Sequence, residues 1–291
     1  MGSKLAPLVL LMGCQRCGTG SFYEAIMEHV RGARRGHPLS GEPEYYGREQ
    51  HFFATDSWGK GVANYLNHFP PCPEHHTFNF VVDATPAYMR KPLVADRLPQ
   101  AMPASALTKL KFMFILRDPA TRLYAYWDQF VLAGTGVNNF DAWVGTTLAK
   151  VAQCQKRNGD QLWPPPDNCD TDTVEGVAAG LYAYQLIYWL HRFEPKQFFV
   201  TTLSAYEEQP AIVVKEAARF IGAEGDLLGN AHSVPAANAV KVMGAMSDWA
   251  RRELGKFYHQ HNAQLLHLFN NQNKISYSPS LKALGIQSWN A

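Results

Sequence analysis

The amino-acid sequence predicts an α/β fold of three layers, in which a central, mostly parallel sheet is flanked by helices. Short, unbroken apolar runs, typical of strands buried on both faces, alternate with segments whose apolar residues recur at helical spacing. The length of 291 residues is enough for one large domain with a substantial core. We therefore expect a single domain over residues 5–291.

The individual elements follow from the same periodicities. Strands are expected at residues 8–12, 79–83, 111–116 and 198–202, which are short apolar runs. Helices are expected at residues 19–30, from Pro119 onward, and at 175–192, 209–222 and 247–269, the last with Trp249 facing inward. The Gly- and Pro-rich segments 32–60 and 134–174 are expected to be irregular, and the second is interpreted as an excursion over the surface near the binding site.

The loop after the first predicted strand is the most informative local feature. Gly13 and Gly18 bracket it, and it opens onto a predicted helix. Such a turn presents backbone N–H groups and the positive end of a helix dipole to an anion. The glycine spacing is that of the nucleotide-binding loop G-x-x-x-x-G-K-[ST], but Thr19 stands in place of its lysine and Arg16 is the cation of the loop. This predicts a P-loop-like fold with a phosphate-binding loop that departs from the lysine-and-magnesium arrangement.

Composition limits the classes of partner. The net charge is +2 and no dense block of Lys and Arg occurs, so nucleic-acid binding is not expected. No apolar stretch approaches the roughly 20 residues that span a bilayer, and no signal peptide is apparent. The first residues, Met-Gly-Ser-Lys, leave open a membrane anchor removed from this end.

Two pairs among the five cysteines are informative. Cys14 and Cys17 form a C-x-x-C, which taken alone indicates zinc or redox chemistry, but its position inside the phosphate loop favours buried packing. Cys154 and Cys169 could form a disulfide, which would indicate an oxidising compartment, although the sequence has no N-x-[ST] glycosylation site.

Five motifs, in the same order along the chain from residue 7 to 270, resemble those of PAPS-dependent sulfotransferases, closest to the carbohydrate branch of heparan sulfate N- and 3-O-sulfotransferases and chondroitin-type enzymes. Gln-Arg-Cys-Gly-Thr at 15–19 is similar to their 5′-phosphosulfate loop, and residues 115–124 are similar to their 3′-phosphate motif. The other resembling motifs are Arg-Glu-Gln-His-Phe-Phe at 48–53 with Gly-Lys-Gly at 59–61, Asp-Ala-Thr-Pro-Ala-Tyr at 83–88, and Phe-Tyr-x-x-His-Asn at 257–262.

The resemblance implies a set of contacts to 3′-phosphoadenosine 5′-phosphosulfate (PAPS). Arg16 would stabilise charge on the departing oxygen, and the alternative for it is a surface ion pair. Arg117 would bind the 3′-phosphate, while Arg122 would either assist or pair with Asp118. The complete implied set is Gln15, Arg16, Cys17, Gly18, Thr19, Gly20, Ser21, Arg117, Tyr124 and Lys241.

The resemblance also implies the groups that act on the acceptor. Glu49 would be the general base, and His51 would orient the reacting groups or relay the proton. The alternatives are an exposed loop glutamate and a packed histidine. Arg48, Lys60 and Asp83 would contact the acceptor, although Lys60 is equally well explained as a solvated lysine.

Two positions and one segment depart from the family pattern. Ala84 stands where the motif has a lysine, and Ala125 stands where the 3′-phosphate motif has a serine, for which Tyr124 or Tyr126 could compensate. Residues 233–243 occupy the place of the loop that closes over the nucleotide, with Asn238 and Lys241 as weak candidates.

The implied function is transfer of a sulfuryl group from PAPS to an acceptor hydroxyl, on a carbohydrate or alternatively on a small hydroxylated metabolite. In-line transfer depends on positioning and charge stabilisation, so no metal ion is expected to be required. Two other classes stay open: a P-loop nucleotide kinase, against which the missing lysine argues, and a catalytically impaired nucleotide-binding protein, which Ala84 and Ala125 favour.

The implied compartment is the Golgi lumen if the chain derives from a type II membrane protein, and the cytoplasm otherwise. The oligomeric state is not determined by the sequence.

Overall fold

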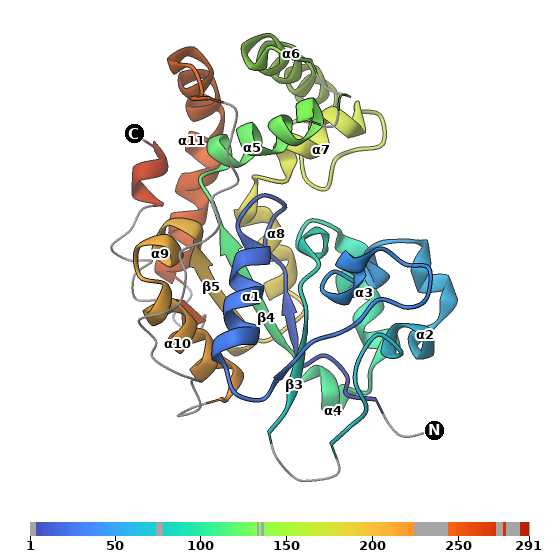
Figure 1. Cartoon of the computed structure of the whole chain (residues 1–291). Helices are drawn as coiled ribbons and strands as arrows, with labels where there is room; N and C mark the ends of the chain where they lie inside the picture. Colours follow the sequence, from blue (N-terminus) through green and yellow to red (C-terminus); the bar gives the residue numbers. More distant parts are fainter. Residues whose placement is uncertain are drawn as a thin grey trace. The chain divides into compact units, whose positions relative to one another are not determined.

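Figure 1 shows a computed structural model of the chain, which describes residues 4–73, 78–132, 134, 137–223, 244–271, 276–277 and 286–290. Contacts divide the chain into two compact units. The first unit comprises Met1–Leu116, Leu190–Asn238 and Lys274–Ala283, and the second comprises Arg117–Trp189, Ala239–Asn273 and Leu284–Ala291. Each unit is described by itself, and the single domain expected from the sequence stays a prediction.

The first unit is built on a six-stranded sheet with the order β2-β3-β1-β4-β5-β6, in which every strand pair is parallel. The strands are β1 (Val9–Leu11), β2 (Ala33–Arg34), β3 (Phe80–Asp83), β4 (Lys111–Leu116), β5 (Phe198–Thr202) and β6 (Ser276–Tyr277). The prediction of a P-loop-like α/β fold with a mostly parallel sheet flanked by helices is confirmed. Because β1 lies between β3 and β4, the loop that follows β1 shares one sheet edge with the residues after β3.

The helices of the first unit are α1 (Thr19–His29), α2 (Val62–Leu66), α3 (Pro92–Ala101), α4 (Ala104–Leu107), α9 (Leu203–Glu208) and α10 (Pro210–Ile221) (Figure 1). The predicted helices 19–30 and 209–222 correspond to α1 and α10, which pack against each other. Helix α10 ends as expected at Gly222, whose φ of 95° is the left-handed conformation that glycine tolerates. Helices α2, α3, α4 and α9 were not predicted, since they are short and α3 contains an internal proline, Pro99.

The segment 32–60 contributes more to the core than its composition indicates. Phe52 and Phe53 begin a short 3-10 helix, Phe52–Ala54, and their side chains are buried. Both rings pack on Tyr65 of α2, with ring centroids 4.7 and 5.1 Å away. These aromatic contacts anchor a stretch that is otherwise made of turns and further 3-10 helices, Glu44–Gly47 and Asp56–Lys60.

The second unit is helical. It contains α5 (Pro119–Leu132), α6 (Phe140–Asn158), α7 (Thr171–Ala178), α8 (Tyr182–Leu190), α11 (Asp248–Asn271) and the 3-10 helix Gln287–Asn290. Their apolar faces form one cluster that includes Leu123, Val144, Val151, Leu181 and Leu254. The predicted helix 247–269 is confirmed as α11, but Trp249 is 39% exposed and does not face inward.

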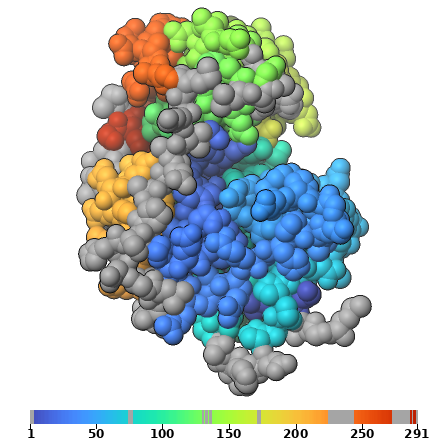
Figure 2. Space-filling model, in the orientation of Figure 1, coloured from blue at the N-terminus to red at the C-terminus, as the bar shows by residue number. Residues whose placement is uncertain are grey.

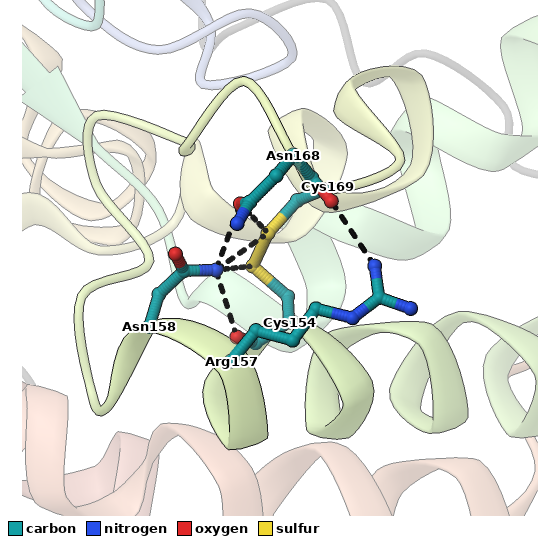
Figure 3. The surroundings of a disulfide bond; sticks show 5 residues. All are labelled: Cys154, Arg157, Asn158, Asn168 and Cys169. Atoms are coloured by element: carbon teal, nitrogen blue, oxygen red, sulfur yellow. Dashed lines mark hydrogen bonds between the residues drawn. A yellow bond between two sulfur atoms is a disulfide. The ribbon is translucent and has the colours of Figure 1, made fainter.

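The interpretation of residues 134–174 as an irregular excursion misses α6, a helix of 19 residues. Val144 and Val151 of α6 are buried in the cluster, so this segment supplies core. A disulfide joins Cys154 near the end of α6 to Cys169, and the Asn158 amide donates a hydrogen bond to the Cys154 carbonyl at 3.0 Å (Figure 3). Most of the polar residues of α6 lie on its exposed face.

The predicted helix 175–192 is divided into α7 and α8. Gly180 lies between them, and a Cβ added there would be 2.9 Å from the Cβ of Pro119 and 3.0 Å from the Tyr258 ring. This close approach requires glycine at the turn between the two helices. Trp163 is only 8% exposed and packs edge-on against Tyr188 of α8.

Candidate active site

The phosphate loop connects β1 to the first turn of α1. Gly13 permits its tight path, because a Cβ added there would lie 2.5 Å from Cγ2 of Thr19 and 2.8 Å from the Ile115 carbonyl oxygen. Gly18 precedes the helix in the left-handed conformation, with a φ of 86°. The first hydrogen bond of α1 runs from the Phe22 N–H to the Gly18 carbonyl at 3.0 Å. The N–H groups of residues 19–21 therefore point past the end of the helix, where an anion can accept them.

The centre of the loop is a compact turn. The Cys17 N–H donates to the Cys14 carbonyl at 3.0 Å, and both cysteine side chains are buried, which agrees with the packing interpretation of the C-x-x-C. Arg16 has a φ of 71°, an unfavourable value for a residue with a Cβ. In the described residues, no three or more His, Cys, Asp or Glu side chains gather closely enough to hold a metal ion.

Residues 48–53, which we call the base segment, lie beside the first turn of α1. Oε1 of Glu49 accepts hydrogen bonds from Arg48, at 2.9 Å from Nη2 and 3.2 Å from Nε. Oε2 of Glu49 is 3.5 Å from Nε2 of His51. A Cβ added at Gly20 would lie 3.3 Å from Nη1 of Arg48, so this guanidinium extends between Glu49 and the phosphate loop helix. Figure 2 shows the atoms of α1 and of residues 35–60, in shades of blue, side by side on one face.

Residues 83–88 hold the backbone of the base segment in place. Hydrogen bonds connect the two segments along their length. The Ala84 N–H donates to the Arg48 carbonyl (2.9 Å), and the Gln50 N–H donates to the Asp83 carboxylate (3.4 Å). The N–H groups of His51 and Phe53 donate to the hydroxyls of Thr85 (3.0 Å) and Tyr88 (3.4 Å), respectively. These bonds support the left-handed conformation of His51, whose φ is 53°. The base segment is thus positioned by residues more than thirty positions away in the sequence.

Asp83 organises this arrangement from the interior. Its carboxylate is fully buried and accepts hydrogen bonds from the Thr85 hydroxyl at 2.6 Å and from the hydroxyls of Tyr65 and Tyr88 at 2.9 Å. Burial raises the pKa of Asp83, while these hydrogen bonds oppose the shift. The expectation that Asp83 contacts the acceptor does not fit a side chain with no exposed surface. Its contacts make it a positioning residue for the base segment.

A cavity of about 440 Å³ opens beside Glu49. It is lined by residues of the phosphate loop, of the base segment and of the segment before α3: Gln15, Glu49, His51, Ala54, Thr55, Pro86, Ala87, Arg90 and Lys91. Three predicted site residues, Gln15, Glu49 and His51, are therefore brought to one place. Burial, followed by the charge of Arg90, lowers the pKa of Lys91.

Arg90 and Lys91 were missed by the sequence reasoning. The signal that could have found them is their position directly after the motif at 83–88, which already pointed to this sheet edge. Lys60 is exposed at the end of its 3-10 helix and is not among the residues that line the cavity, so its contact to the acceptor stays a prediction.

The remaining candidates belong to the second unit or lie outside the described residues. Arg117 is partly exposed, and its carbonyl accepts a hydrogen bond from the Tyr182 hydroxyl at 2.8 Å. Tyr124 is 8% exposed and packs between Trp127 and Phe140, and Ala125 is fully buried. The cofactor contacts of Arg117 and Tyr124 stay predictions. Asn238 and Lys241 lie outside the described residues.

Arg122, for which the sequence left open a part in binding the 3′-phosphate or a pairing with Asp118, lies in the interior. Its side chain is fully buried, donates to the Gly176 carbonyl, and lies 5.4 Å from the centroid of the Tyr126 ring. Asp118 instead accepts a hydrogen bond from the Thr121 N–H at 2.8 Å and caps α5. Arg122 therefore belongs to the interior of the second unit.

Comparison with known proteins gives one family match. The family model described as the sulfotransferase domain matches residues 6–233. The chain is similar to bifunctional heparan sulfate N-deacetylase/N-sulfotransferase 4 of Mus musculus, with 25% identity over 218 residues, and to bifunctional heparan sulfate N-deacetylase/N-sulfotransferase 3 of Homo sapiens, with 24% over 217 residues. Each match covers 74% of this chain, but the chain spans only 22% of the length of these relatives.

A solved structure supports the fold. A sulfotransferase from Alicyclobacillus acidocaldarius aligns with a TM-score of 0.63 and 18% identity, over 98% of this chain and 99% of that chain. At this identity, the likeness concerns the fold. In the part of the chain that the structure describes, no helix combines the length and the apolar composition needed to cross a membrane.

Proposed function

The chain belongs to the sulfotransferase domain family and is a transferase, and we propose that it moves the sulfuryl group of PAPS to an acceptor hydroxyl. The observation that carries this proposal is the cavity that Glu49 and His51 share with Gln15 of the phosphate loop. A proton acceptor and a phosphate-binding loop are the two parts that sulfuryl transfer to a hydroxyl requires at one place.

The phosphate loop fits the 5′ end of such a donor. The N–H groups of residues 19–21 and the partly exposed Arg16 can hold a phosphate and stabilise charge on the oxygen that departs with it. PAPS, when bound, supplies a sulfuryl group on a good leaving group. Arg117, Tyr124 and Lys241 are proposed for the 3′-phosphate end on the resemblance alone.

Glu49 is the proposed general base. Its Oε1 is occupied by Arg48, whereas Oε2 faces His51 at 3.5 Å, a separation too long for a strong hydrogen bond. Oε2 is therefore the atom that can accept the proton of the acceptor hydroxyl, while the hydroxyl oxygen bonds to sulfur and the sulfur–oxygen bond to the phosphate breaks. His51 orients the carboxylate or the hydroxyl.

The acceptor is proposed to be a carbohydrate, because the named activity of the similar proteins is on heparan sulfate. A small hydroxylated metabolite is the alternative. The Golgi lumen is the proposed compartment, and the Cys154–Cys169 disulfide supports an oxidising environment.

Calorimetry with 3′-phosphoadenosine 5′-phosphate tests the donor. We expect micromolar binding in the absence of magnesium; magnesium-dependent binding of ATP instead would contradict the proposal and favour a kinase.

Glu49→Gln tests the base. Turnover should fall at least about 100-fold because the proton acceptor is lost, while the affinity for 3′-phosphoadenosine 5′-phosphate is retained. Glu28→Gln is the matched control, since Glu28 is an exposed carboxylate on α1 with 54% of its side chain accessible. Unchanged turnover in Glu49→Gln would remove the base assignment.

A further inference from the structure

The first unit contains a second cavity, of about 300 Å³, where the strands β1 and β4 begin. We propose that it binds the hydrocarbon chain of a small amphiphilic anion, a linear alkyl carboxylate, whose carboxylate lies at Lys109. The lining residues are Ala6, Pro7, Leu8, Phe53, Val62, Tyr65, Leu66, Ala101, Met102, Pro103, Ala106, Lys109 and Leu110. None of them lines the cavity of Glu49, so the two sites are separate.

The inner part of this cavity favours hydrocarbon over water. It is formed by the buried residues Pro7, Phe53, Tyr65 and Leu110. The Tyr65 hydroxyl donates to the Asp83 carboxylate at 2.9 Å, so the polar atom of Tyr65 is already bound elsewhere. A buried water needs two to four polar partners, which these side chains do not supply. A hydrocarbon chain needs none and is stabilised by each methylene group that leaves water.

The size of the cavity suits a short chain. Apolar cavities of about 150 Å³ already bind benzene, and sites for small molecules begin at about 300 Å³. The volume of about 300 Å³ therefore accommodates a chain of several methylene groups.

The outer part of the cavity indicates the charge of the ligand. Ala6, Pro103 and Lys109 are exposed, and Lys109 is the charged residue of the lining. Among the described residues, no carboxylate lies within ion-pair distance of its ammonium group. A lysine lays its methylene groups on apolar surface and keeps its ammonium group in water. A chain that enters the cavity therefore leaves its headgroup beside a cation, which favours a carboxylate.

The cavity also adjoins the base segment. Phe53 is the last residue of that segment, and its N–H donates to the Tyr88 hydroxyl at 3.4 Å. Its ring packs on Tyr65, with centroids 5.1 Å apart. A ligand that contacts both rings binds the conformation in which they line the cavity, and so stabilises it. Amide hydrogen exchange at Phe53 should therefore become slower when the ligand is bound.

Calorimetric titration of the full chain with butanoate, hexanoate and octanoate tests the chain site. The affinity should rise about fourfold for each added methylene group, the factor that burial of one such group gives. Equal affinity for the three acids would overturn the proposal, because the headgroup alone would then account for binding.

The variant Ala106→Phe fills the cavity and should weaken octanoate binding at least tenfold. Ala104→Phe is the matched control, since Ala104 is an exposed residue of the same helix, α4, and is not among the lining residues. Ala101→Leu, at the end of α3, fills the cavity from a second position and should also weaken binding. Urea unfolding shows which variants fold. Unchanged octanoate binding in a folded cavity-filling variant would place the ligand elsewhere and refute the proposal.

Lys109→Gln tests the headgroup. It should weaken octanoate binding about twofold to fivefold, the range of an exposed ion pair, and leave 1-octanol binding unchanged. Lys196→Gln, at a lysine with 71% of its side chain exposed, should change neither. An unchanged octanoate affinity in Lys109→Gln would contradict the anion assignment, and unchanged exchange at Phe53 on octanoate binding would contradict the contact with the base segment. None of these measurements uses sulfuryl transfer, so their outcome is independent of the proposed function.

Discussion

Polar residues of the sulfotransferase-like motifs lie at a cavity in the first unit and in the interior of the second unit. In the first unit, Glu49 reaches a cavity, and the buried Asp83 holds the segment that carries it. In the second unit, Arg122, His261 and Asn262 also come from motifs that resemble a sulfotransferase, yet they are 0%, 3% and 2% exposed. A motif thus identifies a family without indicating which of its polar side chains meet a ligand.

The difference follows from the elements on which the motifs lie. The phosphate loop and residues 83–88 follow the carboxyl ends of β1 and β3. The base segment is irregular, so its N–H groups need partners, and residues 83–88 supply them. Arg122, His261 and Asn262 lie within α5 and α11, whose backbone groups are paired inside the helices. There the polar side chains bond to other helices, as when the Tyr258 hydroxyl donates to the Val177 carbonyl at 2.9 Å. The first arrangement positions a site, and the second holds a core.

The largest expected effect comes from Asp83→Ala. It removes the acceptor of three hydroxyl donors, so the free energy of unfolding should fall by about 4 kcal/mol and turnover of the folded protein by about 100-fold. Urea unfolding and sulfuryl-transfer kinetics measure the two effects. Affinity for 3′-phosphoadenosine 5′-phosphate should be nearly unchanged.

Two tyrosine variants separate positioning from stability at Asp83. Tyr65→Phe and Tyr88→Phe each remove one hydrogen bond to Asp83, but only Tyr88 also accepts from the Phe53 N–H of the base segment. Tyr88→Phe should therefore lower turnover more than Tyr65→Phe at similar stability. Equal turnover in both variants would show that the hydrogen bond from the Phe53 N–H to Tyr88 does not position the base segment.

The next effect belongs to the second unit. Cys154→Ser/Cys169→Ser opens a disulfide with a sequence separation of 15, and a loop of that size predicts a loss of about 3 kcal/mol in the free energy of unfolding. Reduction of the unchanged protein should have the same effect. A loss below about 1 kcal/mol would indicate that the helical core, and not the disulfide, holds α6.

The smallest effect is a pH dependence. Burial lowers the pKa of His261, more than the charge of Asp160 raises it, so the unfolded chain binds a proton below its pKa of about 6.5 while the folded chain does not. Stability should therefore fall as pH decreases below about 6.5, by at most about 1.4 kcal/mol per pH unit. His261→Gln should flatten this slope in urea unfolding measured from pH 7.5 to 5, whereas His259→Gln, at an exposed position of α11, should not.

The sequence alone determined the strands at 111–116 and 198–202, the glycine-bracketed loop before the first helix, the α/β class and the family. These depend on local properties: an apolar run forms a buried strand, and glycines at fixed spacing permit one tight turn before a helix. Residues 134–174 were misread because α6 has polar residues over most of its surface and a narrow apolar face.

Only the tertiary structure decided which side chains meet. In the folded unit, Asp83 is buried beside Tyr65 and Tyr88, whereas Trp249 is exposed. Arg90 and Lys91 line the same cavity as Glu49. These contacts join residues distant in the sequence, and whether a polar side chain faces a cavity or a core depends on what packs over it. Local patterns do not contain that information, because packing is set by all the elements of a unit together.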